Sequence, residues 1–104
     1  MFLFKRLPSI TSRELEHKIS QREPLEIIDV RETNEFAGGH IPGAKNVPLR
    51  KIKKYQSNKK VYVICQSGAR SRRAVKELKQ NGVDAVNVKG GMMGWRGKTR
   101  GGKL

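Results

Sequence analysis

The sequence predicts an α/β fold, a single domain built on a mostly parallel sheet with helices on both faces. Short β-rich runs alternate along the chain with segments of helical periodicity, the pattern of parallel strands connected by helices. A chain of 104 residues has room for one core. Its 36% hydrophobic content is concentrated in short runs, as a few central strands require.

The first predicted elements are a helix and a strand. Thr11 and Glu14 have the spacing of a capping box, and Ile10 and Leu15 are placed as a hydrophobic staple. A helix is therefore expected to begin at this point. Residues 25–30 form a β-rich run that predicts a central strand, and ligands of open α/β sheets bind beyond the carboxyl ends of such strands.

The middle of the chain predicts a connection, a strand and a short helix. Paired glycines and a Pro-Gly pair in residues 38–44 are turn chemistry. Residues 45–49 predict a short strand at or near a sheet edge, because Pro48 cannot donate to a ladder. We interpret the basic residues 50–60 as the solvated face of a short helix rather than a nucleic-acid contact. The side chains expected to pack inward there are Leu49, Ile52 and Tyr55.

The second half of the chain centres on a strand, a loop and a helix. Four strand-forming residues, 61–64, end at Cys65, the only cysteine in the sequence. A Ser/Gly loop follows, and helical periodicity begins at about Arg70. The remaining predicted features are a helix stop at Asn81-Gly82, a last strand at 83–88 and a turn at Gly90-Gly91.

This segment favours a reactive thiol. A strand, a tight glycine loop and a helix N-terminus can direct several backbone N–H groups into one small space, and the helix dipole favours negative charge there. Cys65, held in that space with Arg70 beside it, should ionise more readily than a free cysteine and act as a nucleophile.

The Cys-x-x-Gly-x-Arg-Ser pattern that begins at Cys65 resembles the active-site loop of the rhodanese family, which moves sulfane sulfur. Residues 28–44 and 90–95 resemble two further stretches of that family, so the resemblance runs from about Thr11 to Trp95. It implies a rhodanese-like domain with a five-stranded, mostly parallel sheet. We divide the chain into an N-terminal extension (1–8), this domain (9–96) and a basic flexible tail (97–104).

The resemblance also assigns the site residues. Cys65 and Arg70 are the expected catalytic residues, and Asp29 and Arg31 are expected to form a supporting ion pair. His40 could form a Cys–His dyad, but in the family this histidine belongs to a structural loop, and we prefer that role. The substrate-binding loop is expected to comprise Gln66, Ser67, Gly68, Ala69 and Ser71.

The expected function is a sulfurtransferase that moves sulfane sulfur from thiosulfate or a similar donor to a thiol or cyanide through a Cys65 persulfide. One alternative is a protein-partnered persulfide carrier with little thiosulfate turnover, and another is a catalytically silent binding module. A cysteine-dependent phosphatase or arsenate reductase is disfavoured, because four residues rather than five separate Cys65 from Arg70.

The charge distribution bears on partners and location. Residues 51–104 hold fifteen Lys/Arg against Glu77 and Asp84, whereas residues 1–50 are nearly neutral. The positive electrostatic field of residues 51–104 should attract a small anionic sulfur donor, and an acidic protein is a candidate partner. An external thiol is the expected acceptor. No cofactor or metal is expected, nor is a nucleic-acid or membrane partner.

The start of the chain is apolar over residues 1–4, but Lys5 ends that run too early for a signal peptide. We therefore expect a cytoplasmic protein. A remnant of an N-terminal membrane anchor is the alternative interpretation of these residues.

Overall fold

The computed structural model describes residues 7–102, and the apolar start of the chain lies outside the described residues. Five strands form one sheet in the order β1-β5-β4-β2-β3, and every pairing is parallel. This confirms the expected α/β class. The strands are β1 (Ser9–Thr11), β2 (Glu26–Asp29), β3 (Lys45–Asn46), β4 (Val61–Ile64) and β5 (Ala85–Lys89).

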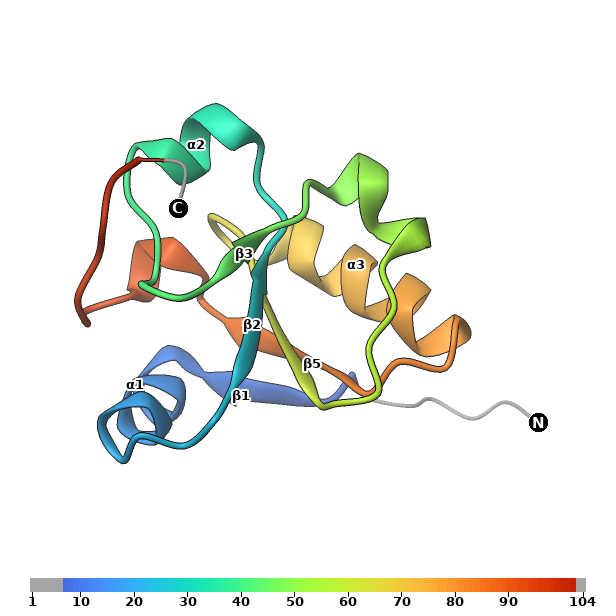
Figure 1. Cartoon of the computed structure of the whole chain (residues 1–104), viewed down its shortest axis with the longest axis horizontal. Coiled ribbons are helices and arrows are strands. Elements are labelled where there is room, and N and C mark those ends of the chain that lie inside the picture. The colour runs from blue at the N-terminus through green and yellow to red at the C-terminus, as the bar shows by residue number, and fades with distance from the viewer. Residues whose placement is uncertain (1–6, 103–104) are drawn as a thin grey trace.

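Helices cover both faces of the sheet, as Figure 1 shows. On one face, α3 (Ala69–Gln80) and the 3-10 helix η1 (Leu49–Lys54) enclose a core that includes Ile52, Val63 and Val75. On the other face, α1 (Ser12–Ser20) and α2 (Thr33–Ala37) enclose a second core. The 3-10 helix η2 (Met92–Gly94) follows β5.

The central strand β4 positions the loop that follows it. All four of its residues are buried, because the strand lies between β2 and β5 and is covered on both faces. Its register pairs Ile64 with Asp29 of β2. The carboxyl ends of β2 and β4 therefore meet at one edge of the sheet, and Cys65 begins its loop there.

Local sequence signals explain several element boundaries. Thr11 Oγ1 accepts from the N–H of Glu14, and Glu14 Oε1 accepts from the N–H of Thr11, so the predicted capping box is present. The predicted edge strand is β3, at the end of the sheet. The helix after Cys65 ends before Gly82, which has a φ of 83°.

The sequence did not predict two elements. The sequence places Ile10 and Thr11 at the start of a helix and predicts no strand before it, whereas Ser9–Thr11 form β1 and pair with β5, and Thr11 also caps α1. Thr33–Ala37 received no assignment, whereas they form α2. Both elements are shorter than the windows over which periodicity can be recognised, and the residues of β1 pair with residues of β5 that lie 78 positions further along the chain.

Residues 97–102 lie beside α2 and the loop that follows it (Figure 1). The backbone N–H of His40 donates to the Arg100 carbonyl at 2.9 Å, and the Arg100 N–H donates to the His40 carbonyl at 2.8 Å. The N–H of Gly102 donates to the Ala37 carbonyl at 2.8 Å. The described part of the expected tail is thus held by backbone hydrogen bonds, and the division into extension, domain and tail stays a prediction.

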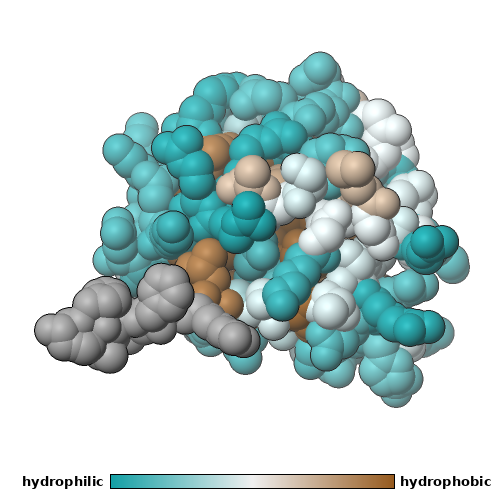
Figure 2. Space-filling view, turned by 180° about the vertical axis from the view of Figure 1, so that it is seen from behind, coloured by the Kyte–Doolittle hydropathy of each residue, from teal (hydrophilic) through white to brown (hydrophobic). Residues whose placement is uncertain are grey.

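The surface is largely polar. The face drawn in Figure 2 is predominantly hydrophilic, with small hydrophobic areas between polar side chains. Among the described large hydrophobic residues, Met93 stands out as exposed, at 72%. Across residues 7–102, no helix has both the length and the hydropathy that a bilayer crossing would need.

Candidate active site

The thiol of Cys65 lies where β4 gives way to α3. The side chain is almost fully buried, with 1% of the residue exposed. Gly68 has a left-handed φ of 112°, and this turns the chain so that N–H groups of the loop point back to the sulfur. The N–H of Gly68 donates to Sγ at 3.0 Å, and that of Ser71 donates at 3.3 Å.

Two opposing effects set the pKa of the Cys65 thiol. Burial is the largest and raises the pKa, because it disfavours the charged thiolate. Hydrogen bonds from the Ser71 hydroxyl and from the backbone N–H groups of Ser71, Gly68 and Ser67 lower it. The hydrogen bonds prevail, so the pKa lies below the usual value for cysteine. A thiol with these donors is prepared to ionise although it is buried.

Ser71 connects the sulfur to β5. Its Oγ accepts from the Cys65 thiol at 3.4 Å, and it donates to the Gly68 carbonyl at 3.0 Å or to Asn87 Oδ1 at 2.6 Å. Ser71 is fully buried and Asn87 is 4% exposed. A hydroxyl can donate only one hydrogen bond. The Asn87 carbonyl oxygen and a Cys65 thiolate would therefore compete for the hydrogen bond that Ser71 donates.

The end of β2 supports the loop from one side through a buried ion pair. Arg31 Nη2 lies 2.8 Å from Asp29 Oδ2, and both side chains are at least 95% buried. The same guanidinium donates to the Gly39 carbonyl at 2.8 Å and to Gln66 Oε1 at 3.3 Å. Arg31 therefore joins three segments, and the supporting role of the Asp29–Arg31 pair stays a prediction.

Arg70 is held by an acidic residue of α2. Its Nη1 and Nη2 donate to the two carboxylate oxygens of Glu35 at 2.7 and 2.9 Å. This bond is the main reason that the pKa of Glu35 falls from 4.5 to about 2. The positive charge of Arg70 is therefore compensated next to the loop, and the assignment of Arg70 as a catalytic residue stays a prediction.

The turn after β5 holds the backbone of the active-site loop through hydrogen bonds. Met92 N–H donates to the Cys65 carbonyl at 2.8 Å, and Met93 N–H donates to the Gln66 carbonyl at 3.0 Å. A Cβ on Gly91 would lie 2.5 Å from each of these two carbonyl oxygens. The close approach therefore requires glycine at this position.

The structure brings some of the predicted site residues together and separates others. Cys65, Gly68 and Ser71 surround the sulfur, and Gln66 connects to Asp29 through Arg31. The loop residues Ser67 and Ala69 are exposed. Sequence reasoning missed three contributors that come from elsewhere in the fold, namely Glu35, Asn87 and Gly91. Glu35 and Gly91 stand in the family-like stretches, whereas no signal in the sequence marked Asn87.

His40 occupies a structural position. Its ring is buried and stacks on Phe36, with centroids 3.6 Å apart and planes 7° apart. Its Nδ1 lies 2.8 Å from the Phe36 carbonyl. Its backbone pairs with Arg100. These contacts fit the loop role rather than that of a base for Cys65. Within residues 7–102, no cluster of His, Cys, Asp and Glu side chains is suited to hold a metal.

Comparison with known proteins identifies the domain type. The chain matches the family model described as "Rhodanese-like domain" over residues 11–98. It is 39% identical over 98 residues to the "Putative sulfurtransferase YtwF" of Bacillus subtilis, which covers 90% of this chain and 95% of that protein. It is also 39% identical to the "Putative sulfur carrier protein YrkF" of the same organism, over 89% of this chain and 53% of the relative.

A solved structure gives the same result. The rhodanese-like domain protein of Staphylococcus aureus superposes with a TM-score of 0.80 and is 41% identical, over 86% of this chain and 92% of that one. The two proteins are therefore similar in both fold and sequence.

Gly91→Ala tests the support beneath the loop. We expect a loss of unfolding free energy well above the about 1–2 kcal/mol of left-handed backbone strain, because the new Cβ meets backbone atoms that cannot rotate away. Gly43→Ala is the matched control, since Gly43 also has a positive φ (88°) but has nothing within 4 Å of a Cβ. Chemical denaturation measures both variants, and equal losses would contradict close packing at Gly91.

Ser71→Ala tests the hydroxyl near the sulfur. The variant should raise the pKa of the Cys65 thiol, because the thiolate loses its hydroxyl donor while burial is unchanged. The ultraviolet absorbance of the thiolate reports on this pKa, and the single cysteine makes the signal unambiguous. Ser67→Ala is the control, since it keeps the backbone N–H and removes only an exposed hydroxyl. A shift in the control alone would contradict the assignment.

Glu35→Gln tests the pair with Arg70. A carboxylate whose pKa is lowered on folding stabilises the protein above its unfolded pKa, and this contribution is lost as pH falls from 4.5 to about 2. We expect the variant to be less stable than the parent by about 1 kcal/mol at neutral pH, with the difference vanishing near pH 2. Glu32→Gln, which breaks the exposed pair with Arg50, should cost less. A pH-independent difference for Glu35→Gln would be inconsistent with this pair.

Proposed function

Because the chain belongs to the rhodanese-like domain family, we propose that it is a sulfurtransferase that carries sulfane sulfur on Cys65 as a persulfide. The family and the names of its relatives support a role in sulfur transfer or sulfur carriage. The persulfide proposal rests on one observation: N–H groups of Gly68 and Ser71 converge on Cys65 Sγ at 3.0 and 3.3 Å. The proposed location is the cytoplasm.

The proposed first step loads the cysteine. The Cys65 thiolate attacks the outer sulfur of thiosulfate or a similar small anionic donor. The sulfur–sulfur bond of the donor breaks, sulfite leaves with the electron pair, and a new sulfur–sulfur bond forms on Cys65. The ring of N–H groups stabilises the negative sulfur throughout, since these donors are fixed before the reaction.

The proposed second step unloads the sulfur. An external thiolate, or cyanide in an assay, attacks the terminal sulfur, and the Cys65 thiolate departs with the electrons of the broken bond. This sequence contains no second cysteine, so a resolving thiol has to come from another molecule. Gln66, Ser67 and Ala69 would line the path of that molecule, since they stand at the half-buried and exposed positions of the loop.

The burial of Cys65 and the pairing of Arg70 favour a second candidate, a persulfide carrier that receives sulfur from a protein partner. Glu35 compensates the guanidinium that would attract a free thiosulfate dianion, which weakens the case for rapid turnover of that donor. The excess positive charge of residues 51–104 would suit an acidic protein partner. Both candidates use the same persulfide and differ in the donor.

Mass spectrometry after thiosulfate treatment tests the chemistry. We expect a gain of one sulfur atom, its removal by cyanide, and no gain in Cys65→Ser, since no other cysteine is present. An unchanged mass after treatment with thiosulfate and with a protein persulfide donor would contradict the proposal.

A steady-state assay with thiosulfate and cyanide then separates the two candidates. Rapid turnover that Cys65→Ser abolishes indicates the transferase, and stoichiometric loading without turnover indicates the carrier. Hydrolysis of an aryl phosphate that depends on Cys65 would instead support a phosphatase.

A further inference from the structure

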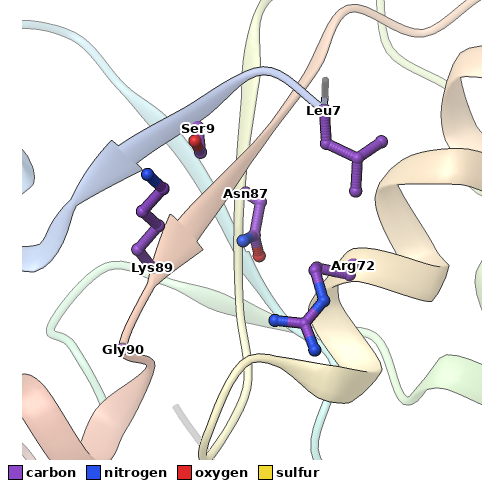
Figure 3. A pocket seen from close by; sticks show the side chains of 6 residues that line it. All are labelled: Leu7, Ser9, Arg72, Asn87, Lys89 and Gly90. Atoms are coloured by element: carbon purple, nitrogen blue, oxygen red, sulfur yellow. The ribbon is translucent and has the colours of Figure 1, made fainter. Parts of the chain in front are cut away.

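We propose that a pocket behind the active-site loop binds a small oxyanion of the sulfate or phosphate class. Figure 3 shows this pocket between β1, β5 and α3. Its volume is about 420 Å³. Its lining residues are Leu7, Ser9, Arg72, Asn87, Lys89 and Gly90.

Two cationic side chains reach the pocket from different elements. Arg72 comes from the first turns of α3 and Lys89 from the end of β5, and both are exposed. Neither forms an ion pair with another described residue. Arg72 Nη1 lies 3.2 Å from the position of a Cβ on Gly68, so its guanidinium rests against the active-site loop. Two positive charges without a direct ion pair thus flank one concave space. After the hydrogen bonds from Thr11, the charge of Lys89 also helps to lower the pKa of Glu14.

Asn87 supplies a neutral donor between the two cations, as Figure 3 shows. The residue is 4% exposed, and its Oδ1 accepts from Ser71. Its Nδ2 has no hydrogen-bond partner among the described residues. Since no fully buried side-chain nitrogen or oxygen in residues 7–102 lacks a partner, this nitrogen has to open to the pocket. A largely buried amide N–H in a pocket that two cations also line is a donor suited to an anionic oxygen.

The charge of the lining selects the ligand class. Among the described residues that line the pocket, Arg72 and Lys89 are charged and none carries a carboxylate. The pocket between α3 and η1 is also rich in cations, but Glu32 and Glu77 line it and compensate its charge. Cations, an amide N–H and the hydroxyl of Ser9 together match an anion with several oxygen acceptors.

The pocket is connected to the nucleophile. An anion that accepts from Asn87 Nδ2 would hold the amide with Oδ1 toward Ser71, and Ser71 would then keep its proton on Asn87. The Cys65 thiolate would lose its hydroxyl donor, and the added negative charge nearby would act in the same direction. Occupancy should therefore make Cys65 harder to ionise, and ionised Cys65 should weaken anion binding equally.

The test is a titration of the full chain with sodium sulfate, followed by two-dimensional amide NMR at an ionic strength held constant with chloride. We expect saturable shifts of the Asn87 side-chain NH₂ and of the backbone amides of Ser9 and Gly90. Sulfate should also raise the pH at which thiolate absorbance appears, and chloride at the same ionic strength should not.

A charge-matched pair of variants makes the test decisive. Arg72→Gln with Lys89→Gln should weaken sulfate binding by about tenfold or more, because both cations of the pocket are removed. Lys76→Gln with Lys79→Gln removes the same charge from exposed positions of α3 that do not line the pocket, and should leave binding nearly unchanged. Equal weakening in both double variants, or shifts confined to residues 66–69, would overturn the site.

Phosphate used in place of sulfate tests the ligand class. Competition between the two anions for the same shifts indicates a general oxyanion site, and sulfate shifts that phosphate cannot displace indicate selection for sulfur oxyanions. Binding is measured on the resting protein and involves no sulfur transfer, so its outcome is independent of the outcome of persulfide loading.

Discussion

The arrangement of the active-site loop centres on the hydrogen bonds that allow the buried thiol of Cys65 to ionise. Removing a thiolate from water costs several kcal/mol, whereas each hydrogen bond to a charged group contributes about 1.5–3 kcal/mol. Cys65 is 1% exposed, so it needs several such donors at once. The N–H groups of Gly68 and Ser71 meet this need only while Gly68 keeps its left-handed conformation. A loop that relaxed would leave an inert buried cysteine.

Segments far apart in the sequence hold the loop in that conformation. Arg31, buried against Asp29, binds the side chain of Gln66, and the N–H groups of Met92 and Met93 bind the loop carbonyls from below. The three family-like stretches are thus one physical unit, in which two stretches fix the backbone of the third. This explains why residues with no contact to the sulfur belong to the pattern that identifies the family.

The sequence predicted what local rules determine and missed what distant contacts determine. The capping box at Thr11, the edge position of the strand predicted at residues 45–49 and the helix after Cys65 follow from spacing and turn chemistry. The structure has all three, although the edge strand is limited to Lys45–Asn46. The strand Ser9–Thr11 exists because β5 pairs with it. Asn87 likewise stands in a run of strand residues. The role of its polar side chain can be recognised only in the fold, where the sheet places it beside Ser71 and the two form a hydrogen bond.

The charges around Cys65 favour sulfur chemistry over phosphate chemistry in the proposed function. Arg70, the cation adjacent to the loop, is held by both carboxylate oxygens of Glu35, so the environment of the sulfur is dominated by neutral N–H and O–H dipoles. Dipoles of this kind can stabilise one negative sulfur, whereas a guanidinium without a carboxylate partner is better suited to a phosphate dianion. Arg72 and Lys89, which form no ion pair among the described residues, line a pocket on the α3 side of β5. The hydrogen-bonded side chains of Ser71 and Asn87 connect this pocket to the thiol. If both proposals hold, the fold separates the group that reacts from the groups that attract anions, and Ser71 and Asn87 connect the two.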